Sequence, residues 1–395
     1  MDDFKSKTSN VRTSTIIMKI LLHDNGLHLR LAPLTLTRPV GDVRMGILTN
    51  AERWKLVEPS AEIYFETEDY LHEKFPSTKD ADVTINAALI PNDEVIAAIL
   101  ALSENEELVA ENNWFARKGT GSIKVNYTGE MPLVISERWH LFQKNEQALQ
   151  SDFSLLTAGR TSQALSRTNT VIGDASQVFL EEGAVVEAAI LNTTSGPIYI
   201  GKDAEIMEGS IVRGPLAMCE HSALKLGAKV YGPSTLGPHC KVGGEVNNVV
   251  FQAYSNKGHD GFLGNALIGE WCNLGADTNT SNLKNNYGFI STYSYEKGEE
   301  VKTDTQFMGV CMGDHSKCGI NTMFNTATVI GVSSNIFGAG FPAKFVPSFT
   351  WGGAEESVPF KFEKAVEYAN NMMARRGLQL TEAEIAILKH IATTK

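Results

Sequence analysis

The chain has 395 residues, of which 43% are hydrophobic and 21% are charged, a composition typical of a soluble globular protein with more than one domain. The formal net charge of −11 argues against nucleic acid or an anionic membrane as the main partner. No apolar run is long enough to span a bilayer, and residues 1–15 lack the apolar core of a signal peptide.

We expect residues 1–17 to form a disordered tail, with Met18 as an alternative start. Over residues 18–156, short apolar strands alternate with helical stretches. The expected strands are Ile16–Leu22, Glu62–Glu66 and Val83–Ile90, and the expected helices are Gly46–Leu56, Asn92–Leu102 and Gln143–Ser151. This alternation predicts an α/β domain with a mainly parallel sheet.

A polar linker over residues 157–170 leads into a region with an unusual hydrophobic period. An aliphatic residue or Met returns at every sixth position: Ile200, Ile206, Val212, Met218, Leu224, Val230, Leu236 and Val242. An α-helix repeats near 3.6 residues and a half-buried strand near 2, so neither explains the pattern. A period of six predicts a parallel β-helix of hexapeptide units over residues 171–353.

The hexad pattern is interrupted at residues 247–261 and 282–309, which are either excursions that line a binding face or simple surface loops. Residues 354–395 contain two predicted helices, Val358–Arg376 and Thr381–His390, expected to cap the end of the coil. The five cysteines have no CxxC spacing, which favours small core residues and a reducing cytoplasm over zinc or disulfide frameworks.

Two stretches carry a family resemblance. NKGHDGFLGNALIGEWCNLGADTNTSNLKNNYG (Asn256–Gly288) resembles the acetyltransferase half of bifunctional UDP-N-acetylglucosamine pyrophosphorylase/glucosamine-1-phosphate N-acetyltransferases. Pro33–Trp54 and Glu137–Phe153 resemble the divergent bacterial branch of sugar nucleotidyltransferases that carry such a coil. The resemblance implies a reduced nucleotidyltransferase-like α/β domain before a left-handed β-helix with a helical C-terminal cap. It also implies cytoplasmic trimers that bind CoA between neighbouring coils and make a cell-wall precursor.

The resemblance also implies roles for individual residues. His259 stands where the family has its catalytic histidine, and Asn273 and Asn282 match asparagines that line the amino-sugar and acetyl site. Lys229 and Asn247 occupy the places of a phosphate-binding arginine and lysine, so the phosphate contacts or the substrate differ here.

The residues themselves support part of this assignment. A thioester is attacked by a neutral amine, and a histidine with a pKa near 6.5 can accept the amine proton. His259 lies between Gly258 and Gly261 in an irregular loop, off the hexad positions. Lys257 and Lys284 are candidates for phosphate binding, although most surface lysines are only solvated. The asparagines either bind sugar hydroxyls or stack at corners that tolerate left-handed dihedrals.

The N-terminal region has a weaker set of candidates. Arg38, Asp42 and Arg44, in the segment RPVGDVR, are candidates to bind nucleotide phosphates and position Mg²⁺. Asn86 follows a predicted strand, where such enzymes place a metal-binding aspartate, and an amide binds Mg²⁺ more weakly. Alternatively, Arg38 and Arg44 have structural roles and pair with acids such as Asp42.

These observations predict acetyl transfer from acetyl-CoA to glucosamine-1-phosphate, followed by Mg²⁺-dependent uridylyl transfer from UTP to give UDP-N-acetylglucosamine. One alternative is a single-activity acyltransferase whose first domain only binds a nucleotide sugar. Another is a non-catalytic trimeric scaffold that binds sugar nucleotides.

Overall fold

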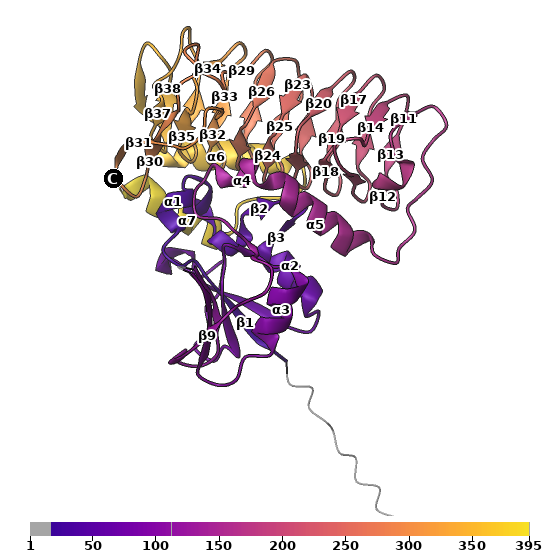
Figure 1. The fold of residues 1–395 in the computed structure, drawn as a ribbon. Coiled ribbons are helices and arrows are strands. Elements are labelled where there is room, and N and C mark those ends of the chain that lie inside the picture. The colour runs from indigo at the N-terminus through magenta and orange to yellow at the C-terminus, as the bar shows by residue number, and fades with distance from the viewer. Residues whose placement is uncertain (1–16, 112, 395) are drawn as a thin grey trace, which may run out of the picture.

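The computed structural model describes residues 17–111 and 113–394, so almost all of the predicted tail lies outside the described residues. An α/β domain is followed by a long coil, and the two parts lie side by side along the coil axis (Figure 1). No helix in the described ranges has the length and apolar character needed to cross a membrane.

The α/β domain contains a six-stranded sheet with the order β4-β1-β5-β8-β7-β9. The strands are β1 Lys19–His23, β4 Glu62–Glu66, β5 Val83–Asn86, β7 Glu106–Ala110, β8 Asn113–Arg117 and β9 Ile123–Asn126. β1 pairs in parallel with β4 and β5, whereas β8 runs antiparallel to β5 and β7. β7 also pairs in parallel with β9, so three of the five pairings between neighbouring strands are parallel, as the prediction of a mainly parallel sheet requires. The two antiparallel pairings arise because the β7–β8 hairpin turns the chain back.

The predicted helices of this domain are present with shifted ends. They are α2 Asn50–Val57, α3 Asp93–Leu100 and α5 Asn145–Thr157; the shorter helices are α1 His28–Leu31 and α4 His140–Gln143. α2 begins late because Thr49 and Glu52 form a capping box at its N-terminus. The residues before it form a small hairpin of β2 Arg44–Met45 and β3 Leu48–Thr49, and a second small ladder joins β6 Leu89–Ile90 to β10 Leu133–Val134.

The second part of the chain is a left-handed parallel β-helix with three faces. The first face contains β11 Thr170–Ile172, β14 Ile190–Asn192, β17 Ile211–Arg213, β20 Lys229–Tyr231, β23 Glu245–Asn247 and β26 Phe262–Gly264, and its line continues in β29 Asn279–Thr280 and β34 Met323–Phe324. The second face contains β12 Val178–Leu180, β15 Ile198–Ile200, β18 Leu216–Met218, β21 Ser234–Leu236, β24 Val250–Phe251, β27 Leu267–Ile268, β32 Cys311–Met312, β35 Val329–Ile330 and β37 Phe345–Val346. The third face contains β13 Val185–Val186, β16 Glu205–Ile206, β19 Ala223–Leu224, β22 Lys241–Val242, β25 Asn256–Lys257, β28 Asn273–Leu274, β33 Lys317–Cys318, β36 Asn335–Ile336, β38 Thr350–Gly352 and β39 Ser357–Pro359.

The hexad residues form the core of this coil, as predicted. All eight are at most 2% exposed: Ile200, Ile206, Val212, Met218, Leu224, Val230, Leu236 and Val242. The five cysteines are buried and free, which agrees with a role as small core residues. The predicted linker runs against the first turns of the coil, where Gln163 donates to the carbonyl of Ala184.

Only one of the two predicted interruptions leaves the coil. Residues 247–261 continue it, since Thr235 pairs with Val250 and Val250 with Leu267; shortened corners there shift the hexad phase. Residues 282–309 do leave the coil and fold into a hairpin of β30 Ser291–Ser294 and β31 Glu299–Lys302. This hairpin contacts the α/β domain, because Arg138 donates to the carbonyl of Tyr293 at 2.8 Å.

The two C-terminal helices are present as α6 Phe362–Ala374 and α7 Glu382–Thr393, and Thr381 and Glu384 form a capping box. They lie along the coil rather than across its last turn, where β39 pairs with β38. Tyr368 of α6 contacts Trp351 near the end of the coil. Arg376, just after α6, donates to the carbonyl of His239, which lies several turns earlier in the coil. α7 packs onto the α/β domain, where the rings of Tyr70 and His390 stack at 4.0 Å.

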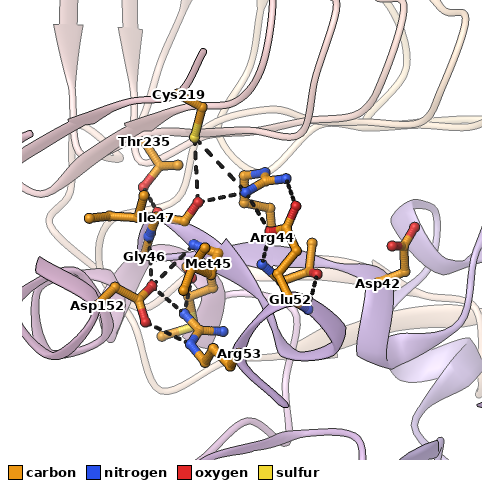
Figure 2. A network of polar contacts seen from close by, with 12 residues as sticks. Asp42, Arg44, Met45, Gly46, Ile47, Glu52, Arg53, Asp152, Cys219 and Thr235 are labelled. Carbon is orange, nitrogen blue, oxygen red and sulfur yellow. Dashed lines mark hydrogen bonds and ion pairs between the residues drawn. The ribbon is translucent and has the colours of Figure 1, made fainter. Parts of the chain in front are cut away.

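The second face of the coil joins the α/β domain through the β2–β3 hairpin (Figure 2). Thr235 of the coil donates to the carbonyl of Gly46 at 2.6 Å, and Asp152 of α5 accepts from the Ile47 N–H at 2.8 Å. Gly46 has φ 72°, and a Cβ there would lie 2.4 Å from the Asp152 carboxylate. The hairpin therefore needs glycine at the point where the two parts of the chain meet.

Candidate functional site

A cleft of about 780 Å³ separates the third face of the coil from the C-terminal half of α6. It contains two of the site residues predicted from the sequence, His259 and Asn273. Lys229, Asn247, Lys257, Asn282 and Lys284 do not line it. The cleft is therefore the candidate site for the predicted acyl-transfer chemistry.

His259 lies at the corner that follows β25, with its side chain exposed on the cleft wall. The corner is narrow: Gly261 has φ 114°, and a Cβ there would lie 2.2 Å from the Thr278 carbonyl. Glycine after the histidine is thus required by the close approach of the next coil. The exposed imidazole can accept a proton from a ligand in the cleft.

Lys257 occupies a position that belongs to the apolar core. On the third face it pairs with Val242, which in turn pairs with Leu224. Its side chain is 1% exposed, and Nζ donates to the carbonyls of Gly243 at 3.2 Å and His259 at 2.6 Å. Burial lowers the pKa of the Lys257 ammonium to about 8, although nearby carboxylates oppose this shift. Lys257 is thus inaccessible to substrate, contrary to its predicted role, and instead holds the His259 loop from beneath.

Replacing Lys257 with methionine is expected to lower the kcat of the predicted acyl transfer by about 10- to 100-fold with little change in KM, because a loosened loop misplaces the imidazole. Steady-state kinetics, with hydrogen exchange of residues 258–261 as a second readout, would measure this. Lys124→Met makes the same change on the exposed strand β9 of the α/β domain and is the control. A wild-type kcat with faster exchange in the Lys257 variant would contradict the positioning role.

The backbone N–H of Gly258, next to the histidine, differs in its hydrogen bonding from the N–H groups at the same place in the turns before and after it. Gly243 N–H donates to the Lys257 carbonyl at 2.7 Å, and Gly275 N–H donates to the Cys318 carbonyl at 3.1 Å. The N–H of Gly258, between them, donates to no acceptor among the residues that the structure describes. Because it borders the cleft, this N–H is available to an oxyanion that forms there.

The two asparagines predicted to line the amino-sugar site have different surroundings. Asn273 lines the cleft, whereas Asn282 donates to the side chain of Asn265 at 2.8 Å, at a corner where Asn265 has φ 47°. Asn282 therefore fits the alternative of stacking asparagines. Lys229 and Asn247 lie on the first face, and the Lys284 ammonium donates to the Phe289 carbonyl at 2.8 Å. Their substrate contacts stay predictions.

Most of the charged residues in the cleft were not predicted from the sequence. Lys225, Lys241 and Lys317 project from the third face, and Arg375 and Arg376 come from the end of α6. In the sequence, Lys241 and Lys317 each precede a buried strand residue, which marks them as outward-facing. The sequence contains no signal that α6 folds back over them.

Arg38, predicted to bind nucleotide, instead joins the two parts of the chain. Its side chain is 4% exposed, and its guanidinium donates to Glu270 at 2.7 Å and pairs with Asp314. Both carboxylates belong to the coil. These contacts correspond to the structural alternative for Arg38.

The Arg44 guanidinium also forms an ion pair within the chain. Its two terminal nitrogens donate to the two carboxylate oxygens of Glu52 at 2.9 and 3.0 Å (Figure 2). The backbone N–H of Arg44 donates to Gln252 of the coil at 2.7 Å. This bidentate pair uses the guanidinium edge that a nucleotide phosphate would need.

The predicted metal ligands do not fit Mg²⁺ well. Both polar atoms of the Asn86 amide bond within the chain, because Nδ2 donates to the Trp114 carbonyl at 2.9 Å and Oδ1 accepts from Ala88 N–H at 3.0 Å. Asp42 lies to one side of the hairpin network (Figure 2), and burial, opposed by Arg38, raises the pKa of its carboxyl to about 6. The described residues contain no group of three His, Cys, Asp or Glu side chains arranged to hold a metal.

Comparisons with known proteins agree with the two-part organisation. Residues 20–161 match a family model described as sugar nucleotidyl transferase. The N-terminal third of the chain is thus similar to sugar nucleotidyltransferases. The bifunctional protein GlmU of Trichodesmium erythraeum (strain IMS101) is 26% identical over 164 residues, which are 40% of this chain and 30% of that protein. The chain thus matches less than a third of the length of this relative.

Other relatives are described as acetyltransferases. The putative uncharacterized acetyltransferase YaiX of Escherichia coli (strain K12) is 20% identical over 44% of this chain and 76% of its own length. Among solved structures, the polySia-specific acetyltransferase NeuO is 12% identical, with a TM-score of 0.26 over 49% of this chain and 87% of that one. The UDP-N-acetylglucosamine acyltransferase from Campylobacter jejuni is 12% identical, with a TM-score of 0.22 over 59% and 97%.

Proposed function

We propose that this chain transfers an acyl group from an acyl-CoA thioester to an amino sugar that carries phosphate, in the cleft beneath α6. The observation that carries this proposal is the exposed His259 imidazole on a cleft wall lined by cations and by no carboxylate. Phosphate groups of both reactants would be attracted to such a wall.

The residues of the cleft suggest how the step proceeds. The amine nitrogen attacks the thioester carbonyl while His259 takes up the proton that the amine loses. The Gly258 N–H stabilises the oxyanion of the tetrahedral intermediate. The C–S bond then breaks, and the CoA thiolate leaves and takes up a proton to become a thiol. Asn273 offers an amide that can donate to and accept from sugar hydroxyls.

Acetyl-CoA and glucosamine-1-phosphate are the proposed reactants. The stretch Asn256–Gly288 and the similarity to a bifunctional GlmU support this choice. The first face supports a homotrimer, because it leaves three isoleucines of neighbouring turns exposed: Ile172 at 45%, Ile190 at 38% and Ile211 at 50%. A column of exposed aliphatic side chains is typical of a face that binds another copy of the chain.

The test is release of free thiol from acetyl-CoA, followed with a thiol-reactive dye. Glucosamine-1-phosphate is expected to support turnover, and glucosamine without phosphate is expected to support much less. The matched control is N-acetylglucosamine-1-phosphate, which has no free amine. No thiol release with any amino-sugar phosphate would refute acyl transfer and leave the non-catalytic alternative.

Uridylyl transfer is the second candidate, carried by the family match over residues 20–161. The engaged guanidinium groups of Arg38 and Arg44, and the poor fit of Asp42 and Asn86 to Mg²⁺, favour the single-activity alternative. We therefore expect no pyrophosphate release from UTP, N-acetylglucosamine-1-phosphate and Mg²⁺. Pyrophosphate release above the no-enzyme rate would establish the bifunctional assignment instead.

A further inference from the structure

A second pocket, of about 130 Å³, lies where the β30–β31 hairpin meets the α/β domain. The α/β domain contributes Arg30 of α1 and residues 137–139, and the hairpin contributes residues from both of its strands. Figure 1 shows the hairpin beside α1. The pocket shares no lining residue with the cleft beneath α6, so it is a separate place on the molecule.

Arg138 is buried at this pocket with only neutral groups as partners. Its side chain is 2% exposed, and its guanidinium donates to the Thr292 hydroxyl at 3.1 Å, to the Tyr293 carbonyl at 2.8 Å and to the Ala32 carbonyl. Within residues 17–111 and 113–394, Arg138 forms no ion pair, and its Nε has no hydrogen-bond partner. A buried cation without a counter-charge is costly, and an anion in the pocket would remove that cost.

The other buried arginines show that this arrangement is unusual for the chain. Four arginines in the described part of the chain are buried. Three of them pair with a carboxylate: Arg38 with Asp314, Arg44 with Glu52 and Arg53 with Asp152. The chain thus supplies an acid to each of its buried arginines except Arg138, the one that lines this pocket.

The other charges of the pocket do not neutralise Arg138. Its two acids, Glu137 and Glu296, both pair with Arg30, the second at 3.8 Å from the Arg30 Nε. The hairpin adds Lys297 and Lys302, which are exposed. Four cationic and two acidic side chains therefore line the pocket, which leaves a formal excess of two positive charges.

We propose that this pocket binds a phosphate group between Arg138 of the α/β domain and Lys297 and Lys302 of the hairpin. A phosphate monoester carries about two negative charges at neutral pH, which matches the excess in the pocket. The Arg138 Nε–H is available to one phosphate oxygen, and charge-assisted hydrogen bonds of this kind are the strong ones. A volume of 130 Å³ is below the roughly 300–1,000 Å³ of pockets that take whole drug-sized ligands, so it suits one phosphate group rather than a nucleotide.

The phosphate has two possible sources, inorganic phosphate and the phosphate group of a sugar phosphate. Isothermal titration calorimetry of the full chain with inorganic phosphate and with glucosamine-1-phosphate distinguishes them, and the tighter probe identifies the source. We expect a Kd below about 1 mM for at least one of the two. Amide hydrogen exchange of residues 291–302 gives a local readout, since a ligand that joins the hairpin to the α/β domain slows its opening.

The decisive variant is Lys302→Glu, which reverses an exposed charge on β31 and leaves the buried Arg138 in place. We expect it to weaken binding of the tighter probe at least about tenfold and to abolish the slowing of hairpin exchange. Lys79→Glu makes the same change at an exposed site outside both pockets and is expected to alter binding by less than about twofold. Equal effects of the two variants would overturn the proposal, as would hairpin exchange that neither probe changes in the wild type.

A third variant separates this pocket from the cleft beneath α6, which is also cationic. Arg375→Glu reverses a charge in that cleft and is expected to leave the slowing of hairpin exchange unchanged. Loss of the slowing in this variant would place the phosphate in the cleft and refute the second site. The outcome does not depend on acyl transfer, because hairpin exchange and calorimetry are measured without acyl-CoA.

Discussion

Replacing His259 with alanine is expected to lower the kcat of acyl transfer by about 10²- to 10⁴-fold, the usual contribution of a positioned general base. The imidazole is exposed on the cleft wall, and its loop is held by the buried Lys257 ammonium. KM for the proposed amino-sugar phosphate should change little, since the residues proposed to attract its phosphate are others. Thiol release as a function of pH measures the effect, and the limb of the wild-type profile that reports the base should disappear.

His221→Ala is the matched control for this experiment. His221 stacks on His239 at a corner of the same coil and does not line the cleft. Its loss should therefore leave the pH profile unchanged. A His259→Ala protein that keeps full turnover, or that loses turnover only in proportion to lost folded protein, would show that His259 is not the base.

Replacing Arg38 with methionine is expected to lower the free energy of unfolding by about 3–5 kcal/mol, because it leaves the buried Asp314 carboxylate and the half-buried Glu270 carboxylate without their partner. Arg38 binds Glu270 and Asp314, and Asp314 also accepts from the Thr37 hydroxyl at 2.7 Å and from the Glu270 N–H at 2.8 Å. Urea unfolding followed by circular dichroism without any nucleotide measures the loss.

Two further variants make the Arg38 experiment specific. Arg167→Met removes an exposed arginine from the linker over residues 157–170 and should cost less than about 0.5 kcal/mol. Adding Asp314→Asn to Arg38→Met should recover part of the loss, because it removes one of the unpaired charges. If Arg38→Met unfolds like the wild type but abolishes nucleotide binding to the α/β domain, the role predicted from the sequence is correct and the structural role is not.

Local patterns in the sequence were sufficient for much of the fold. The hexad period predicted the coil because each hexapeptide unit buries one residue in the core. All eight of these residues are buried. The capping box at Thr381 predicted the start of α7, since Thr381 and Glu384 satisfy backbone groups within one turn. The β7–β8 hairpin was missed because its strands, EELVA and NWFAR, lack a long apolar run.

Contacts between distant segments explain the errors at the candidate sites. From the sequence, Lys257 is a candidate for phosphate binding or a solvated surface lysine, and both alternatives require an exposed side chain. Because the corners of the coil are shortened there, Lys257 pairs with Val242 and occupies a core position. Arg38 and Arg44 lie in a segment that resembles nucleotidyltransferases. Asp42 is one acid near Arg38, as the structural alternative expected, yet the two acids that hydrogen-bond to Arg38 are more than 200 residues away.

The sequence by itself determined the coil, its helical C-terminal segments and the position of His259, because a repeat and a capping motif depend on neighbours within a turn. Only the tertiary structure decided that α6 folds back along the third face and that Arg375 and Arg376 face Lys225 and Lys241. It also decided that Arg38 joins the coil to the α/β domain. These features depend on which distant surfaces of the chain pack together. The local sequence of one segment does not indicate the segment against which it packs.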